Sequence, residues 1–155
     1  PIFTSSFDIA IGDVTEDLGN TDISTYKHQL YGSKLLLVED NELNQIFAEE
    51  VLSEAGIQLI IADDGQKALE KLEQGDFDGV LMDIQMPIMD GYEATRKIRQ
   101  QVKYKNLPVI AMTATLMQSD IVKIQEVGMN DYIGKPIDDD EMFSTMAKWI
   151  KPRNI

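Results

Sequence analysis

Five short, unbroken apolar runs, separated by stretches of helical period, are the feature that most constrains what this chain can fold into. The runs occupy residues 35–38, 59–62, 80–82, 109–112 and 132–133. Apolar runs without polar alternation are typical of strands that are buried on both faces, as in a parallel sheet. We therefore predict five short strands in one parallel sheet.

The stretches between the runs repeat apolar residues three or four positions apart, which predicts amphipathic helices. The five apolar faces are expected at Leu43, Phe47, Val51 and Ala55; Ala68, Leu69 and Leu72; Ala94, Ile98 and Val102; Ile121 and Ile124; and Met142, Met146 and Ile150. Gly56, Gly75 and Gly128 stand where three of these helices should end. Five strands in strict alternation with five flanking helices predict an α/β fold with a doubly wound sheet.

Composition narrows the possible functions. The 155 residues carry 27 acidic and 14 basic side chains, a formal net charge of −13, which argues against direct binding to nucleic-acid phosphates. The absence of cysteine excludes disulfide scaffolds, zinc–thiolate sites and thiol catalysis. No apolar run approaches the roughly 20 residues that span a bilayer, so we expect no direct membrane contact.

Residues 1–33 differ from the rest of the chain. They are rich in Ser, Thr, Gly and Asp and contain five acids and one base, which predicts an acidic linker or leader, although residues 7–11 could form a strand. The first residue is Pro rather than Met, so we expect a piece cut from a longer protein. We also expect this leader to pack on its own domain or on a neighbouring molecule.

Charged and polar residues follow four of the predicted strands, where open α/β sheets bind their ligands. Glu39 and Asp40 follow the first strand, Asp83 the third, Thr113 the fourth and Lys135 the fifth. Each has an ordinary alternative role taken singly: a helix-capping acid, a turn residue, a strand end or a solvated lysine. Their convergence on one edge of the sheet favours a functional site.

Three carboxylates side by side must be compensated. A pair of like charges about 4 Å apart repels by about 4 kcal/mol at an effective dielectric constant of 20, so a proton or a cation is needed. Mg²⁺ prefers oxygen ligands, binds through one or two carboxylates and leaves positions for phosphate oxygens, which makes it the natural cation. Lys135 could hold the phosphate as a point charge.

The sequence resembles the receiver domain of two-component response regulators. The resemblance rests on Glu39-Asp40, Asp83, Thr113 and Lys135-Pro136 at these strand ends and on the run MDIQMPIMDG at residues 82–91. It covers about residues 34–153. The runs VEDNELN at 38–44 and GMNDYIGKPI at 128–137 further resemble receivers of hybrid sensor histidine kinases. The resemblance implies a flavodoxin-like sheet with strand order 2-1-3-4-5.

The resemblance also implies a role for each site residue. Asp83 would accept a phosphoryl group from a phosphohistidine. Asp40, Asp83 and the main-chain carbonyl of Gln85 would bind Mg²⁺, with Glu39 acting mainly through water. Lys135 would pair with Asp83 at rest and contact a phosphoryl oxygen after transfer, and the Lys135–Pro136 bond is expected to be cis.

Further positions would control the response and its lifetime. Thr113 and Tyr132 would form the switch: the hydroxyl of Thr113 moves to the phosphoryl group and Tyr132 turns inward. Gln85 and Thr115 would tune the rate of acyl-phosphate hydrolysis. His28, in the leader, is expected to be an ordinary linker residue rather than a phosphoryl donor, because a donor histidine would lie on a long helix of a bundle.

We therefore expect a cytoplasmic phosphorelay module, from the carboxyl end of a hybrid kinase, that catalyses only its own phosphorylation and dephosphorylation. Its partners would be the kinase's phosphohistidine domain and a histidine phosphotransfer protein. The alternatives are a stand-alone single-domain regulator and a pure interaction module. A Mg²⁺-dependent aspartyl-phosphate phosphatase of the haloacid dehalogenase class would need an aspartate at Gln85. A flavodoxin would need a Ser/Thr/Gly-rich loop in place of Glu39-Asp40.

Overall fold

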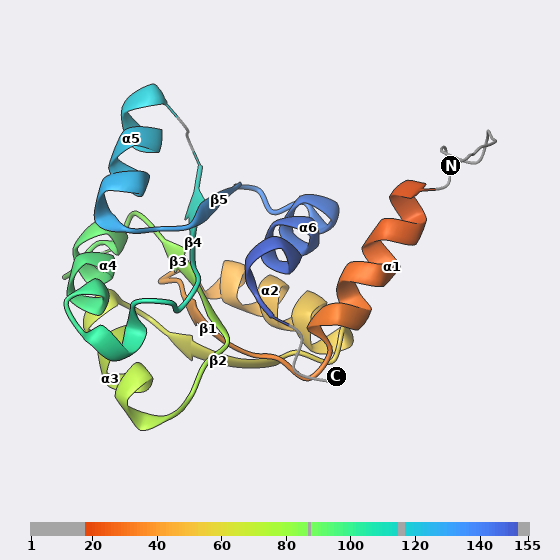
Figure 1. Cartoon of the computed structure of the whole chain (residues 1–155), viewed down its shortest axis with the longest axis horizontal. Helices are drawn as coiled ribbons and strands as arrows, with labels where there is room; N and C mark the ends of the chain where they lie inside the picture. Colours follow the sequence, from red (N-terminus) through yellow and green to blue (C-terminus); the bar gives the residue numbers. More distant parts are fainter. Residues whose placement is uncertain (1–17, 87, 115–116, 152–155) are drawn as a thin grey trace.

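A parallel sheet with helices on both faces forms the body of the molecule (Figure 1). The computed structural model describes residues 18–86, 88–114 and 117–151. The strands are β1 (Lys34–Val38), β2 (Gln58–Ala62), β3 (Gly79–Asp83), β4 (Val109–Thr113) and β5 (Asp131–Gly134). They pair in the order β2-β1-β3-β4-β5, all parallel, which confirms the predicted fold and strand order.

Six α-helices lie in the described part of the chain. They are α1 (Leu18–Leu30), α2 (Glu42–Glu54), α3 (Gly65–Gln74), α4 (Gly91–Arg99), α5 (Gln118–Val127) and α6 (Asp139–Trp149), with a short 3₁₀ turn, η1 (Val102–Tyr104), after α4. The last five are the helices that the sequence predicts. None of the helices among the described residues combines the length and apolarity that a bilayer-spanning helix needs.

The core has two halves, one on each face of the sheet. Alternate strand side chains face α3, α4 and α5, and the others face α1, α2 and α6. Because every strand in the interior of the sheet is covered on both sides, all five residues of β3 and of β4 are buried. This explains why the strands are unbroken apolar runs in the sequence.

Short polar residues begin the helices at the edge of the sheet. Asn41, Asp64 and Asp90 each accept a hydrogen bond from a main-chain N–H in the first turn of α2, α3 and α4, respectively. Two of the predicted helix ends have a left-handed glycine, Gly56 at φ +81° and Gly128 at φ +98°, a conformation that strains other residues. The chain therefore turns sharply back into the next strand.

The apolar face that the sequence predicts for α2 is wrong in part. Leu43 and Phe47 are 76% and 42% exposed, whereas Ala48 and Leu52 are buried against the sheet. Val102 is also exposed, because α4 ends at Arg99 and Val102 lies in η1. The period of the apolar residues predicted where the helices lie. At these positions it did not predict which side faces the core.

Helix α1 lies in the segment that composition predicts to be a linker. It packs against α6 (Figure 1). The side-chain amide of Gln29 donates to the main-chain carbonyls of Ala147 (2.8 Å) and Ile150 (3.2 Å) at the end of α6, and Leu30 is fully buried. The described part of the leader thus packs on its own domain, while residues 7–11 lie outside the described residues.

We predict that Leu30→Ala lowers the free energy of unfolding by about 2–4 kcal/mol, because a fully buried leucine is lost from the core beneath α1. Urea unfolding followed by the fluorescence of Trp149, the single tryptophan, would measure the loss. Ser24→Ala, an exposed position on the same helix, is the control and should change stability by less than about 0.5 kcal/mol. Equal stability of Leu30→Ala and wild type would show that α1 does not belong to the folded unit.

Candidate functional site

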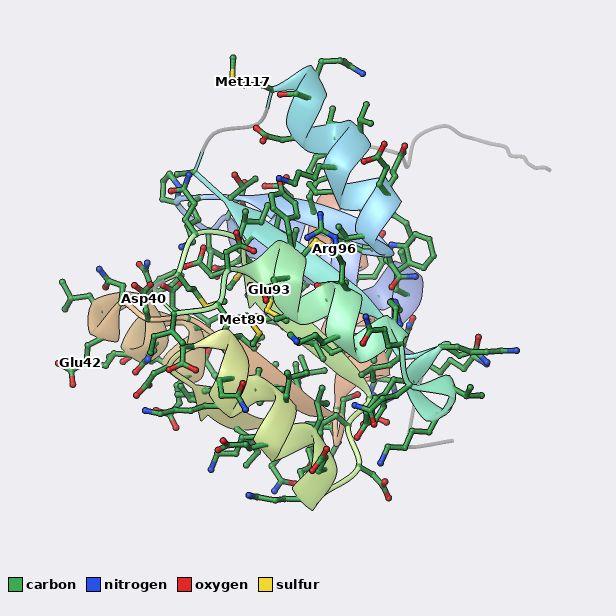
Figure 2. All side chains as sticks on the ribbon, turned by 90° about the vertical axis from the view of Figure 1, so that its left-hand side faces the viewer. Asp40, Glu42, Met89, Glu93, Arg96 and Met117 are labelled. Atoms are coloured by element: carbon green, nitrogen blue, oxygen red, sulfur yellow. The ribbon has the colours of Figure 1, made fainter. Side chains whose placement is uncertain are left out.

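A cleft opens where the loops after β1, β3, β4 and β5 meet, at the carboxyl edge of the sheet. Its volume is about 190 Å³. The side of the cleft formed by the first loop includes Asp40, close to the start of α2 (Figure 2). The lining residues are Glu39, Asp40, Asn41, Asn44, Asp83, Ile84, Gln85, Met112, Thr113, Ala114 and Lys135. The strand-end residues singled out in the sequence therefore do converge.

Three carboxylates gather in this cleft beside one ammonium group. Carboxylate oxygens of Glu39, Asp40 and Asp83 all lie within 4.8 Å of one another. Glu39 and Asp83 are buried, 1% and 4% exposed, while Asp40 is exposed. The Nζ atom of Lys135 lies 3.0 Å from Oε1 of Glu39 and 3.2 Å from Oδ1 of Asp83, so one cation is shared by two buried anions.

The loop after β1 holds Glu39 in place through main-chain contacts. The N–H of Glu39 donates to the carbonyl of Ala62 (3.0 Å), which extends the pairing of β1 with β2 by one residue. The N–H of Asn41 donates to Oε2 of Glu39 (3.1 Å), and the side chain of Asn41 in turn accepts from the N–H of Asn44 to begin α2. Asn41 is therefore the N-cap of α2.

The electrostatics of the cleft leave its negative charge only partly compensated. Burial, and next the negative charge of Glu39, raise the pKa of Asp83 from 3.8 to about 6, although the Lys135 ammonium opposes this shift. Burial alone would lower the pKa of Lys135, but the close contacts with the negatively charged Glu39 and Asp83 outweigh it, so this pKa is raised. Lys135 therefore stays protonated at neutral pH. Asp83 is ionised there, and its buried negative charge destabilises the folded state.

The carboxylate cluster fits a hard divalent cation. Its donors are all oxygens, and three carboxylates against one ammonium leave an excess of negative charge. Glu39 Oε1 is buried and makes an ion pair with Lys135 but no well-directed hydrogen bond. Such an oxygen remains available to a water molecule or a cation.

The other predicted residues lie around the cluster. Thr113, at the end of β4, and Gln85, two residues after Asp83, both line the cleft. Tyr132 lies on β5, paired with Ala111 of β4, and is partly buried behind the cleft rather than in it. The Lys135–Pro136 bond is cis, as expected. Thr115 lies outside the described residues.

The sequence interpretation missed two polar residues at the site, one that lines the cleft and one behind its first loop. Asn44 lines the cleft, and the side-chain amide of Gln45 donates to the main-chain carbonyl of Glu39 (2.6 Å). Both lie near the start of α2, four and five residues after Asp40. Two consecutive amide side chains so soon after an acidic pair are the signal that could have indicated them.

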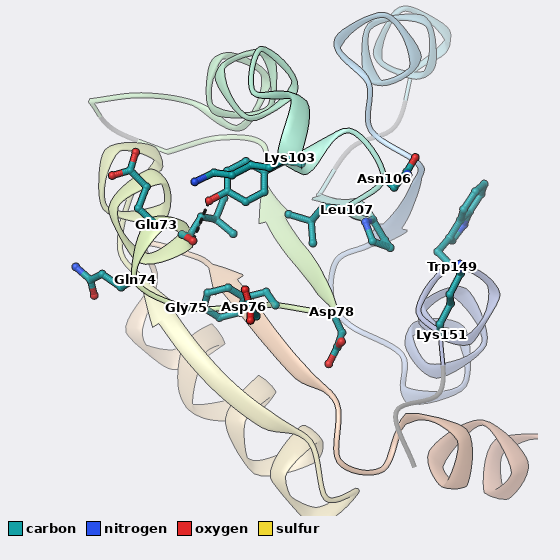
Figure 3. Close-up of a pocket in the computed structure, with 14 residues that line it drawn as sticks. Glu73, Gln74, Gly75, Asp76, Asp78, Lys103, Asn106, Leu107, Trp149 and Lys151 are labelled. Atoms are coloured by element: carbon teal, nitrogen blue, oxygen red, sulfur yellow. Dashed lines mark hydrogen bonds between the residues drawn. The ribbon is translucent and has the colours of Figure 1, made fainter. Parts of the chain in front are cut away.

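A larger hollow, of about 580 Å³, lies at the opposite edge of the sheet, before β3 and β4 (Figure 3). Its walls include Phe77, Tyr104, Leu107 and Trp149, with both acidic and basic side chains at the rim. The Tyr104 hydroxyl donates to the carbonyl of Leu72 inside it (2.9 Å). Size therefore does not single out the site here: the cluster of buried charge lies in the smaller cleft.

Comparison with known proteins gives one family. The model of the response regulator receiver domain matches residues 35–147. The chain is 35% identical, over 132 residues, to the CAI-1 autoinducer sensor kinase/phosphatase CqsS of Vibrio cholerae; the match covers 84% of this chain and 19% of CqsS. The chain spans only 6–19% of the length of the sensor kinases that it matches.

Solved structures agree. The receiver domain of the sensor histidine kinase PA1611 from Pseudomonas aeruginosa, which has a magnesium ion in its active-site cleft, matches with a TM-score of 0.71 and 39% identity, over 76% of this chain and 97% of that one. The receiver domain of Ssk1 from Saccharomyces cerevisiae, solved together with the histidine phosphotransfer protein Ypd1, matches with a TM-score of 0.72 and 28% identity, over 77% of this chain and 90% of that one.

The raised pKa of Asp83 predicts that Asp83→Asn stabilises the cation-free protein. The folded state binds the Asp83 proton more tightly than the unfolded chain does, so the ionised carboxylate destabilises folding above about pH 6. Urea unfolding in a chelator should show a gain of about 1–3 kcal/mol near pH 7.5 that shrinks below about pH 6 and is lost near pH 4. Asp76→Asn, at an exposed position on the opposite edge, removes the same charge as a control. If the stability gained in Asp83→Asn did not depend on pH, the raised pKa of Asp83 would be contradicted.

Proposed function

Since the chain belongs to the family of response regulator receiver domains, we propose that it accepts a phosphoryl group on Asp83 from a phosphohistidine. Asp83 is a buried carboxylate at the carboxyl end of the central strand, paired with Lys135 and within 4.8 Å of Glu39 and Asp40. This arrangement is the observation that carries the proposal. We place the receiver itself at residues 34–153, with residues 1–33 as a leader whose helix α1 packs on it.

The transfer needs a nucleophile, a cation and no further acid. A carboxylate oxygen of Asp83 forms the new bond to phosphorus while the phosphorus–nitrogen bond of the donor breaks; the electron pair stays on the donor nitrogen, and the imidazole leaves neutral because its other ring nitrogen carries a proton. Lys135 lies 3.2 Å from Asp83 Oδ1 and would hold a phosphoryl oxygen. Because Lys135 also pairs with Glu39, it stays at the cleft when its contact with Asp83 changes.

We assign the carboxylate cluster to Mg²⁺. Asp40, Asp83 and the main-chain carbonyl of Gln85 would be the protein ligands, with Glu39 acting through water. The bound cation would neutralise charge on the transferring group and align it for in-line attack. The magnesium ion in the PA1611 receiver, 39% identical to this chain, supports this assignment.

The switch is proposed for Thr113 and Tyr132. Thr113 lines the cleft, and its carbonyl accepts a hydrogen bond from the N–H of Lys135 (2.8 Å), so β4 and the lysine loop are joined there. Tyr132 is partly buried against the core half that includes α4 and α5. A new anion at Asp83 that draws in the Thr113 hydroxyl would change the packing around Tyr132 and α5. Gln85 and Thr115 are proposed to set the lifetime of the acyl phosphate.

The proposed context is a hybrid sensor histidine kinase. All eight of the relatives compared are sensor or histidine kinases, and the chain matches a small part of each. The phosphoryl donor would be the kinase's phosphohistidine domain, and the acceptor downstream would be a histidine phosphotransfer protein. We expect this exchange in the cytoplasm.

The partner would dock on α2, beside the cleft. Leu43, Ile46 and Phe47 are 76%, 57% and 42% exposed and lie on one side of the helix, since they are three and four residues apart. Helix α2 begins directly after the loop that carries Asp40. Clustered exposed apolar residues mark interaction surfaces. The structure of the Ssk1 receiver with Ypd1 supports a partner of this kind.

We predict that Asp83→Asn abolishes labelling by acetyl phosphate in Mg²⁺, because the substitution removes the carboxylate that we propose to accept the phosphoryl group. Intact-protein mass spectrometry would count the phosphoryl groups, and a chelator should abolish labelling of the wild type. Asp76→Asn, the exposed control, should be labelled normally. Labelling of Asp83→Asn at full stoichiometry would show that another residue is the phosphoacceptor.

The docking surface gives a separate prediction. Leu43→Ala with Phe47→Ala should slow phosphoryl transfer from phosphorylated Ypd1, used as a surrogate donor, by about tenfold, since we expect the two exposed apolar side chains together to contribute about 1–2 kcal/mol. Labelling by acetyl phosphate should not change, because this small donor needs no docking surface. Val102→Ala, an exposed apolar residue in η1, is the control. Parallel loss with both donors would place the defect in the cleft instead.

A further inference from the structure

Gln45 is a polar residue near the start of α2 whose side chain turns back toward the sheet. Its Nε2 atom donates to the main-chain carbonyl of Glu39 at 2.6 Å and lies 3.2 Å from Oδ1 of Asp63, to which it also donates. The two acceptors lie in the loops that follow β1 and β2. One side chain therefore joins two loops at the carboxyl edge of the sheet.

The carbonyl that Gln45 holds belongs to the peptide group between Glu39 and Asp40. Glu39 is fixed at its other polar groups as well: its N–H donates to Ala62, and its carboxylate contacts the N–H of Asn41 and the ammonium of Lys135. With the carbonyl also held, the direction in which the main chain leaves β1 is set. Asp40 follows immediately and is exposed, so the aim of its carboxylate depends on that main-chain direction.

We propose that Gln45 is a positioning residue for the divalent-cation site. By holding the peptide group before Asp40, it keeps the Asp40 carboxylate within 4.8 Å of the oxygens of Asp83 and Glu39. Partners that orient metal ligands typically change metal affinity by 10- to 100-fold when they are removed, and a single neutral hydrogen bond by somewhat less. The inference rests on the proposed function only in taking the cluster to be a Mg²⁺ site.

The chemistry of the side chain matches this role. The amide nitrogen of Gln45 has two hydrogens and two acceptors, and the group adds no charge to a cluster that already holds three carboxylates. Methionine has a similar length and helix propensity but no hydrogen-bond donor. Gln45→Met therefore removes the proposed function of the side chain while it keeps the helix and the volume.

The test is isothermal titration with Mg²⁺ of the wild type, Gln45→Met and Gln45→Ala. We expect both variants to bind Mg²⁺ about five- to tenfold more weakly. Urea unfolding in a chelator should show both variants folded. The Mg²⁺ concentration that gives the half-maximal rate of labelling by acetyl phosphate should rise by the same factor. The maximal rate should not change, because Asp83 and Lys135 are intact.

Two controls separate positioning from general stability. Gln125→Met makes the same change at an exposed position on α5 and should leave Mg²⁺ affinity unchanged. Asp63→Ala removes the exposed second acceptor but keeps the bond to Glu39, and should change affinity by less than about twofold. Unchanged Mg²⁺ affinity in Gln45→Met, or an equal loss in Gln125→Met, would overturn the proposal. Mg²⁺ binding by a wild type that is never labelled would overturn the proposed function and leave the inference on Gln45 standing.

Discussion

Two carboxylates buried side by side, those of Glu39 and Asp83, are the constraint on which the rest of the site depends. The parallel pairing of β1 with β3 brings the ends of these strands together, and with them the two acids. Lys135, from the end of β5, contacts both and makes the arrangement possible. The compensation is incomplete, because burial and Glu39 together still raise the pKa of Asp83 to about 6. This balance suits the phosphoacceptor role proposed for Asp83, because Lys135 helps to keep the carboxylate ionised at neutral pH without fully compensating its charge.

The fold and most of the cleft were predictable because both depend on local sequence. A strand covered on both faces must be apolar throughout, so β3 and β4 could be recognised from composition alone. The residue after such a strand lies at the sheet edge whatever the details of packing, which is why Asp83, Thr113 and Lys135 could be assigned to one site. The cis bond at Lys135–Pro136 was expected only from the family resemblance, because residue spacing alone does not predict it.

What the sequence did not predict depends on tertiary contacts. Helix α1 has the sequence LGNTDISTYKHQL, whose Gly, Asn, Thr and Ser residues favour helix weakly, and it is stabilised by burying Leu30 and by the bonds of Gln29 to α6. In α2 the four-residue period through Leu43 and Phe47 follows the outward side of the helix, whereas Ala48 and Leu52 face the sheet, so the period misled the assignment of the buried side. The consecutive amides Asn44 and Gln45 could have drawn attention in the sequence, but the bond of Gln45 to the carbonyl of Glu39 depends on how α2 packs beside β1.

A comparison of the two edges of the sheet shows why the net charge of the chain does not locate the functional site. The pairing of individual acidic side chains locates it better. At the amino edge two acids are bonded: Asp78 accepts from the N–H of Lys34 (2.8 Å), and Asp131 accepts from the indole of Trp149 (2.8 Å) and lies 3.7 Å from the ammonium of Lys148. At the carboxyl edge the excess charge persists, and apolar side chains of α2 are exposed next to it. Both features are unfavourable in the isolated domain, and binding can relieve each of them, the first through a cation and the second through a protein surface. Both unfavourable features therefore lie at the edge of the sheet that carries Asp83, and the docking proposed for a phosphoryl donor would relieve them there.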